Sequence, residues 1–383
     1  MQIRLCSWVK TIHAFGLLLF FTSTGVNAQV GQDFQQFRQR TDSLFKAANA
    51  LCKQDSTGRK ASNWMNKATA LQAIIDDAEL REKYKELDLH IELAQALGKA
   101  SENDVEGMFA GSTSNGLAAI TQVLADLGKQ ALLASQRFDS PLDAEKAVQY
   151  FQECLEAYKH CGKTQNQVDA AWKNIGISWQ WIRFYKAVAY RKSGKEDLAE
   201  KEYSTLIKMG WDEPQVFLEL ADLFRSTGKM EEVQKILLQG IEKKSANIPL
   251  NCALTRHYLQ TDQLKKAMAQ IKPFDAWLGY NSNLVLTKAL VYEKKGDLKK
   301  ADALFKAPHK SDPHEVEINS EYAAYLIRKA KNSEAFDAEE FADKAYNLMH
   351  HASELSPENA TIISEMASIK SRYPKVKIEK NDN

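Results

Sequence analysis

The stretch KALVYEKKGDLKKADALFKAPHKSDP, residues 288–313, decides the fold, because its spacing of apolar and turn residues recurs along the chain. Its glycine, Gly296, ends a run with apolar residues at helical spacing. Steps of 34 residues back from it reach Asp262, Gly228 and Gly194, each in a similar setting. Gly and Asp tolerate the left-handed backbone in which many helices end. The recurrence therefore predicts four successive pairs of helices joined by tight turns.

Two pairs of positions in each unit are expected to form the core between its helices. In the first helix a small residue precedes a larger one by three, as in Ala289 and Tyr292. In the second helix the separation is four, as in Ala301 and Phe305. Both spacings put the two residues on one helix face. The corresponding residues of the other units are Ala187, Tyr190, Ala199 and Tyr203; Ala221, Phe224, Val233 and Leu237; and Thr255, Tyr258, Ala267 and Ile271.

These positions resemble the tetratricopeptide repeat family, whose loose pattern runs Trp, Leu, Gly and Tyr, then Ala, Phe and Pro. The resemblance covers residues 180–313 in four units, with Ala or Thr in place of the family's first-helix Gly. A fifth unit follows, with extra residues expected in its turn around KNSEAFDAEE. Pro313 and Pro357 are expected to begin the helices that follow them. The resemblance implies an all-α fold, an α-solenoid of tetratricopeptide-like antiparallel helix pairs.

We expect five segments along the chain. Residues 1–28 form a signal peptide, and residues 29–178 form an N-terminal region of helical hairpins with degenerate repeats. The array of about five units occupies residues 179–357. Residues 358–373 are expected to form a capping helix, and residues 374–383 a disordered tail.

The first 28 residues have the layout of a secretory signal. Arg4 and Lys10 precede an apolar run, small residues stand at 26–28, and no Asp or Glu occurs before residue 29. The apolar run, Ala14 to Phe21, is far shorter than the roughly 20 residues that span a bilayer. We therefore expect cleavage after Ala28 and export of the mature chain to the periplasm or cell envelope, or its secretion.

The charge balance favours a protein partner. The chain has 51 Lys and Arg against 50 Asp and Glu, and 44% of its residues are hydrophobic. Without Arg4 and Lys10 the balance is 49 against 50, a net charge of −1. A nearly neutral chain has no bulk attraction to nucleic acid or to an acidic membrane surface. We expect another protein as partner, no nucleic acid, and no stable membrane insertion after cleavage.

Four cysteines follow the signal: Cys52, Cys154, Cys161 and Cys252. An oxidising compartment would permit two disulfides among them. Cys154 and Cys161 stand on a predicted helix at a separation of roughly 10 Å along its axis, so they could form a disulfide only if the helix ends before Cys161. Buried thiols are favoured, with disulfides as the open alternative.

The sequence contains no convincing catalytic motif. Residues 111–116, GSTSNG, have the glycine spacing of a phosphate-binding loop, but Leu117 and Ala118 replace the Lys and Ser or Thr that it requires. We expect a turn or kink between helices there. His309 and His314 flank an acidic loop that would form at most an adventitious metal site. No catalytic residue, cofactor or metal ligand is predicted, which favours a non-enzymatic protein.

The family resemblance implies that first helices line the concave side of the superhelix. In the family the groove residues stand at the second, fifth, ninth and twelfth places of each unit. Such a surface suits an extended peptide or a helix of a partner, with Arg side chains available for a carboxylate. On this register the candidate partner-binding residues are Trp181, Phe184, Val188, Arg191, Leu218, Asp222, Arg225, Arg256, Leu259, Leu286 and Leu290.

Two other interpretations concern the aromatic segment 171–188. Its aromatic residues favour core packing, but Trp181 and Phe184 could instead form a sugar-binding platform. That platform would suit a helical carbohydrate-binding protein or a cell-wall glycan hydrolase. A chaperone-tail clamp is not supported, because the family's Lys and Asn at the fifth and ninth places are absent, as at Phe184 and Val188. The leading hypothesis is a non-enzymatic, exported scaffold that binds another protein.

Overall fold

The structure is a computed structural model that describes residues 26–54, 60–160 and 178–377. Its regular secondary structure is helical throughout these ranges, which confirms the predicted all-α class. The chain forms two compact units, Met1–Phe109 and Ala110–Asn383. The predicted signal peptide lies outside the described residues except for its last three, which begin the first helix.

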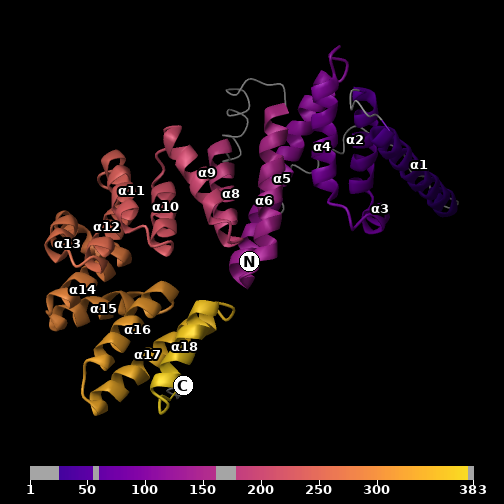
Figure 1. The fold of residues 1–383 in the computed structure, drawn as a ribbon. Helices are drawn as coiled ribbons and strands as arrows, with labels where there is room; N and C mark the ends of the chain where they lie inside the picture. Colours follow the sequence, from indigo (N-terminus) through magenta and orange to yellow (C-terminus); the bar gives the residue numbers. More distant parts are fainter. Residues whose placement is uncertain (1–25, 55–59, 161–177, 378–383) are drawn as a thin grey trace. The chain divides into compact units, whose positions relative to one another are not determined.

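The first unit is a small group of helices in which α2 packs against α1 and α4 (Figure 1). Leu71 and Ile74 of α2 are fully buried, and Phe45 of α1 contacts the Tyr84 ring edge-on at 5.0 Å between centroids. The Tyr84 hydroxyl donates to Asp42 over 2.6 Å. Its helices are α1 (Val26–Gln54), α2 (Ala61–Asp76), α3 (Ala78–Lys83) and α4 (Leu89–Asn103).

The second unit is a series of helix pairs in which each pair packs on the next (Figure 1). α18 packs against α17 after the last pair. The 3₁₀ helix η3 (Lys272–Tyr280) follows α13. The α-helices of this unit are α5 (Ala110–Phe138), α6 (Pro141–His160), α8 (Trp179–Lys192), α9 (Glu196–Lys208), α10 (Pro214–Ser226), α11 (Met230–Lys243), α12 (Ile248–Gln260), α13 (Leu264–Ile271), α14 (Ser282–Lys295), α15 (Leu298–Ser311), α16 (Val316–Lys331), α17 (Ala335–Leu355) and α18 (Ala360–Arg372).

The four turns predicted at 34-residue steps all have the left-handed backbone. The φ angles are +73° at Gly194, +75° at Gly228, +56° at Asp262 and +85° at Gly296. In each turn the next residue donates its backbone N–H to a carbonyl five residues back, over 2.8–3.0 Å. This arrangement satisfies carbonyl groups that the end of a helix leaves without an intrahelical donor. The predicted turn positions are therefore confirmed.

In the four predicted units the small first-helix residue and both second-helix residues are buried, whereas the larger first-helix residues Tyr190, Phe224 and Tyr292 are half-buried and Tyr258 is 7% exposed. The small residues of the first helices, Ala187, Ala221, Thr255, Ala289 and Ala323, are at most 1% exposed. Their partners in the second helices are buried as well, with exposed fractions of 0–3%. Those partners are Ala199, Tyr203, Val233, Leu237, Ala267, Ile271, Ala301 and Phe305.

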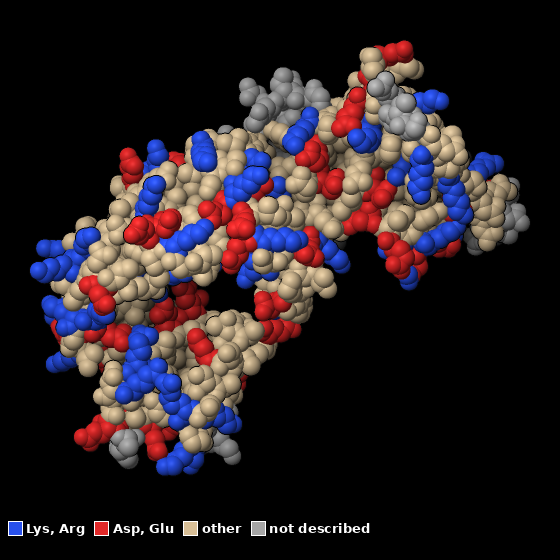
Figure 2. Space-filling view, in the orientation of Figure 1, with Lys and Arg blue, Asp and Glu red and all other residues tan. Residues whose placement is uncertain are grey.

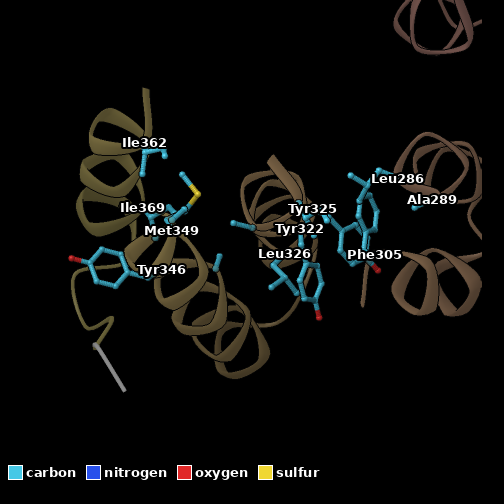
Figure 3. Close-up of a cluster of buried hydrophobic side chains, with 14 of the residues drawn as sticks. Leu286, Ala289, Phe305, Tyr322, Tyr325, Leu326, Tyr346, Met349, Ile362 and Ile369 are labelled. Carbon is cyan, nitrogen blue, oxygen red and sulfur yellow. The ribbon is translucent and has the colours of Figure 1, made fainter. Parts of the chain in front are cut away.

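The last pairs share one continuous hydrophobic core (Figure 3). Phe305 of α15 is fully buried and stacks on Tyr325 of α16, with ring centroids 4.3 Å apart and planes 20° apart. Met349 of α17 is also fully buried, and Ile362 and Ile369 extend this core to α18. The side chains of one pair therefore complete the core of the next.

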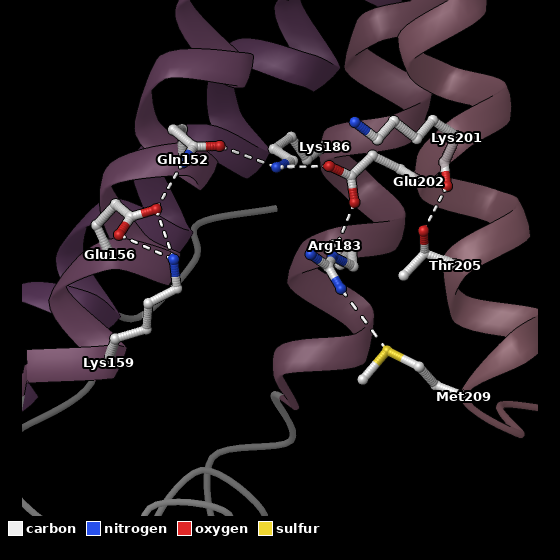
Figure 4. A network of polar contacts seen from close by, with 9 residues as sticks. All are labelled: Gln152, Glu156, Lys159, Arg183, Lys186, Lys201, Glu202, Thr205 and Met209. Carbon is white, nitrogen blue, oxygen red and sulfur yellow. Dashed lines mark hydrogen bonds and ion pairs between the residues drawn. The ribbon is translucent and has the colours of Figure 1, made fainter.

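A buried ion pair joins α6, α8 and α9 (Figure 4). Lys186, which is 4% exposed, places Nζ 2.9 Å from Oε1 of Glu202 and donates over 2.9 Å to Oε1 of Gln152. Arg183 contacts the other carboxylate oxygen of Glu202 over 2.7 Å. These contacts give a polar link between the start of the array and the α5–α6 pair.

A glycine allows the close contact between α5 and α6. A Cβ atom at Gly128 would lie 2.6 Å from the ring of Phe151, which is fully buried. That distance is far below van der Waals contact, so only glycine permits this approach without a shift of the ring.

The two compact units divide at residue 110, and the boundary expected at residue 178 between the hairpin region and the array stays a prediction. The second compact unit begins at Ala110, because α5 and α6 pack with each other and with α8. The segment GSTSNG does not form a turn between helices, because it lies within the first turns of α5. Its residues have no β-branched run or proline that would interrupt the helix, and a Cβ atom added at Gly111 would meet no neighbouring side chain or segment within 4 Å.

Two predicted details of the C-terminal pairs are also corrected. The extra residues of the fifth unit lengthen α17 and do not enlarge the turn, which is residues 332–334. Alanines and carboxylates at its start continue the helical pattern. Pro313 and Pro357 precede their helices by three residues, and Glu315 and Asn359 occupy the N-cap positions. The Asn359 side chain accepts from the backbone N–H groups of Thr361 and Ile362.

The cysteines in the described residues are buried. Cys52 is 8% exposed, Cys154 is fully buried and Cys252 is 1% exposed. Burial raises the pKa of the Cys154 thiol well above its ordinary value. Cys154 and Cys252 are thiols, as predicted. Cys161 lies outside the described residues, as do Trp172 and Ile175 of the aromatic segment.

Candidate partner-binding groove

A groove of about 660 Å³ runs across the first helices α12, α14 and α16. Leucines from successive pairs form its apolar part, and charged and amide side chains surround them. The lining residues are Leu259, Gln260, Leu290, Glu293, Lys294, Leu298, Glu321, Tyr325, Arg328, Lys329, Asn332 and Ser333.

Two ion pairs hold the helices that line the groove. Arg328 of α16 contacts Glu293 of α14 through two parallel contacts, Nε to Oε1 at 2.8 Å and Nη2 to Oε2 at 2.9 Å. Such bidentate pairs fix the relative orientation of both side chains. Arg256 of α12 pairs with Glu321 of α16 and donates through Nε to Thr287 Oγ1 over 3.2 Å. The three helices are thus tied to one another by side chains at the groove.

The tyrosine of the groove, Tyr325, is neutral at physiological pH, as an ordinary phenol is. Tyr325 is 1% exposed, and this burial, with smaller contributions from Asp302 and Glu293, raises its pKa to about 12. Its ring is therefore an uncharged wall of the groove at physiological pH. The two guanidinium–carboxylate pairs, together with Lys294 and Lys329, supply the charged groups.

The predicted partner-binding residues other than Trp181 and the three arginines fall into three groups. Leu259 and Leu290 line the groove. Phe184, Val188 and Leu286 are buried, with exposed fractions of 6%, 9% and 1%. They pack between helices and do not line this groove. Leu218 is half-buried on α10 and Asp222 is exposed on the same helix.

The three arginines predicted to receive a partner's carboxylate each contact a carboxylate of this chain. Arg191 donates to Glu219 over 2.8 Å, and Arg225 pairs with Asp222 on its own helix. Arg256 pairs with Glu321. A partner's carboxylate would have to displace one of these groups, so the guanidinium groups are part of the scaffold.

The rings of the aromatic segment pack on one another. Trp181 lies edge-on to Trp211 at 5.0 Å and to Phe184 at 5.5 Å between centroids. Phe184 also contacts Tyr203 at 5.8 Å. Because neighbouring rings cover Phe184, the Trp181–Phe184 pair does not present an open platform for a sugar ring.

Tyr325 and Arg328 are among the groove residues that the sequence-based register missed. The register stopped at the fourth unit, and one more step of 34 residues from Leu290 and Glu293 reaches residues 324 and 327. The groove is lined by Tyr325 and Arg328, each one place further along the chain. A fifth step of the register would therefore have fallen one residue short of each. The sequence feature that could have identified them is the Tyr and Arg in α16, the first helix of the fifth unit.

The described residues show neither a metal centre nor a membrane-spanning helix. Within them, no three His, Cys, Asp or Glu side chains converge as ligands for one metal ion. None of the helices in the described ranges combines the length and apolarity that crossing a bilayer requires. Lys and Arg side chains are interspersed with Asp and Glu over the face in Figure 2, in keeping with the near-zero net charge.

Comparisons with known proteins find similarity in structure. No protein-family model matches the chain, and no curated protein matches it. A thermophilic TPR protein of Thermus thermophilus is 17% identical and matches with a TM-score of 0.41, covering 50% of this chain and 98% of that one.

Two further solved structures match over more of the chain. A tetratricopeptide repeat protein of Parabacteroides merdae is 13% identical, with a TM-score of 0.37 and coverage of 74% of this chain and 98% of that one. The human IFIT1 dimer with m7Gppp-AAAA is 13% identical, with a TM-score of 0.42 and coverage of 87% and 69%.

Proposed function

We propose that this chain, a tetratricopeptide-like helical repeat protein, is a non-enzymatic scaffold that binds another protein in the α12–α14–α16 groove. The observation that carries the proposal is the groove itself: apolar leucines from successive pairs, flanked by fixed ion pairs. Extended peptides and amphipathic helices are recognised by such surfaces, with apolar anchors in the groove and polar contacts at its edge.

The partner class follows from the groove's composition. Leu259, Leu290 and Leu298 offer apolar contacts, while Glu293 and Arg328 already neutralise each other. A partner segment with apolar side chains on one face and few charges at its centre would bury these leucines without leaving a charge unpaired. The nearly neutral chain supports a protein partner over nucleic acid.

Site-specific photo-crosslinking tests the groove. A benzoylphenylalanine at Gln260, which is exposed and lines the groove, is expected to form an adduct with a partner in cells that make the protein. The matched control is Ala269 of α13, which is exposed in the same helix pair outside the groove lining. Arg328→Glu should lower the Gln260 adduct yield at least about five-fold, because it puts a second carboxylate beside Glu293.

The same variants show how the binding proposal could fail. Arg328 is partly exposed, so its substitution should cost about 1 kcal/mol of stability or less. A normal melting temperature for Arg328→Glu would therefore assign the lost adduct to binding. Equal yields at Gln260 and Ala269, or a yield unchanged by Arg328→Glu, would place the partner elsewhere.

We also propose that the mature chain is exported to the periplasm or cell envelope, on the basis of its N-terminal sequence. The expected mature N-terminus is Gln29, because small residues stand at 26–28 after the apolar run. Intact-mass measurement and N-terminal sequencing of protein from a fractionated native host check this. Ala28→Glu should leave an uncleaved precursor, whereas a wild-type chain found in the cytosol with Met1 retained would refute export.

A further inference from the structure

A second cavity, of about 840 Å³, lies between α15, α16 and α17. It uses a different face of α16 from the groove: Tyr322 and Leu326 line the cavity, while Tyr325 and Arg328 line the groove. Cavities of about 300–1,000 Å³ with an apolar wall and a few converging polar groups are typical of small-ligand sites. This cavity has that size and composition.

The charged groups at the cavity are predominantly cationic. Lys306 and Lys310 come from α15 and Lys344 from α17, against one carboxylate, Glu354. Four histidines also line it: His309, His314, His350 and His351. Glu354 is already occupied, because its carboxylate oxygens lie 3.4 Å from His351 Nδ1 and 3.8 Å from His350 Nδ1.

The lysines can turn toward a ligand at low cost. Lys306 pairs with Asp302 at 2.6 Å and Lys344 pairs with Glu340 at 2.5 Å, each within its own helix. Exposed pairs of this i,i+4 kind contribute little to stability. Both ammonium groups are about half exposed, so they are free to re-orient over the cavity.

The histidines are held in place by specific contacts. The Asn319 amide donates to the Pro313 carbonyl over 2.8 Å, and its oxygen lies 2.8 Å from Nδ1 of His309. His309 therefore donates from Nδ1 and keeps Nε2 for another group. Nδ1 of His314 lies 3.2 Å from Nε2 of His351, which ties the loop before α16 to α17. The cavity wall is thus a built arrangement of imidazoles beside the lysines.

The inner wall of the cavity is apolar. Tyr322 and Leu326 are 6% and 2% exposed, and the half-buried Leu348 of α17 lies beside them. Tyr322 is neutral at physiological pH, as an ordinary phenol is, and burial raises its pKa further, to about 12. An apolar body would fit against this wall while an anionic group met the lysines.

We propose that this cavity binds a small organic anion, with its acidic group at Lys310 and Lys344 and its apolar body against Tyr322 and Leu326. The lysines favour an anion and oppose a divalent metal ion, because three positive charges surround the histidines. Binding here is separate from the binding of a protein partner in the groove.

Fluorescence titration with 8-anilinonaphthalene-1-sulfonate tests the proposal on the full mature chain. The expected result is saturable binding that the double variant Lys310→Glu/Lys344→Glu weakens at least about ten-fold, the equivalent of about 1.4 kcal/mol. N-phenyl-1-naphthylamine has the same rings without the sulfonate, and its binding should change less than about two-fold in the double variant. Sodium sulfate should compete only weakly, because it lacks the apolar body.

Matched variants decide between specific binding and a general effect of charge. Lys299→Glu/Lys265→Glu makes the same charge change at exposed lysines that do not line the cavity, and should leave the affinity unchanged. Equal losses in the two double variants, equal effects on the anion and its neutral analogue, or no saturable binding by the wild type would overturn the proposal. Zn²⁺ binding that His314→Ala abolishes and the lysine variants leave intact would also overturn the proposal, because it would make this a metal site.

If Lys310→Glu/Lys344→Glu unfolds, the single variants Lys310→Gln and Lys344→Gln should each weaken sulfonate binding about three-fold.

Discussion

Replacing Phe305 by alanine is expected to lower the free energy of unfolding by about 3–5 kcal/mol. The ring is fully buried and stacks on Tyr325, so its removal leaves a cavity between α15 and α16 that the helices can fill only in part. Urea unfolding followed by helical circular dichroism measures the loss. Phe305→Leu keeps most of the volume and should cost less than Phe305→Ala.

An exposed phenylalanine provides the matched control for this substitution. Phe138 at the end of α5 is 56% exposed, and Phe138→Ala should change stability by no more than about 0.5 kcal/mol. A loss below about 0.5 kcal/mol for Phe305→Ala would mean that its ring is exposed and that the repeat register is wrong.

Replacing Lys186 by methionine is expected to cost about 3 kcal/mol. Removing one partner of a buried ion pair typically costs about 3–5 kcal/mol, because the other charge is left without its counter-charge. Glu202 would keep its contact with Arg183, which places the expected loss at the low end of that range. Gln152 would also lose the donor that reaches it from Lys186. Chemical unfolding of the variant measures the effect.

A double-mutant cycle separates charge from packing in this network. Adding Glu202→Gln to Lys186→Met should recover about 1–2 kcal/mol, because it removes the charge of a carboxylate that has lost one of its two cationic partners. Lys201→Met makes the same substitution at an exposed lysine one residue from Glu202 and should change stability by about 0.5 kcal/mol or less. If Lys186→Met costs as little as Lys201→Met, the ion pair does not contribute to the α6–α8–α9 contact.

The sequence predicted the repeated features of the fold better than the single ones. Asp262 was identified as a turn residue by its register alone, and it adopts the same left-handed conformation as the three glycines. The register worked because every unit meets the same packing constraint. The sequence at the start of α17 has no counterpart in the other units. Its residues are compatible with either a polar loop or a helix. Only its packing against α16 decides between the two.

The site was predictable in outline but not in detail. Leu259 and Leu290 were found by position, because the first helices of such arrays face one side. Phe184 and Leu286 hold equivalent positions but are buried, since neighbouring side chains differ from unit to unit. The pairing of Arg256 with Glu321 joins residues 65 apart, and a one-dimensional pattern does not show which carboxylate an arginine reaches.

The buried thiols make the second unit suitable for following local opening by alkylation. Cys154 lies in α6 and Cys252 in α12, so each sulfur reports on a different helix pair. A thiol-reactive reagent needs an accessible thiolate, and burial raises the pKa of both groups while excluding the reagent. The two labelling rates would therefore measure how often each pair separates from its neighbours, without any reporter group having to be added.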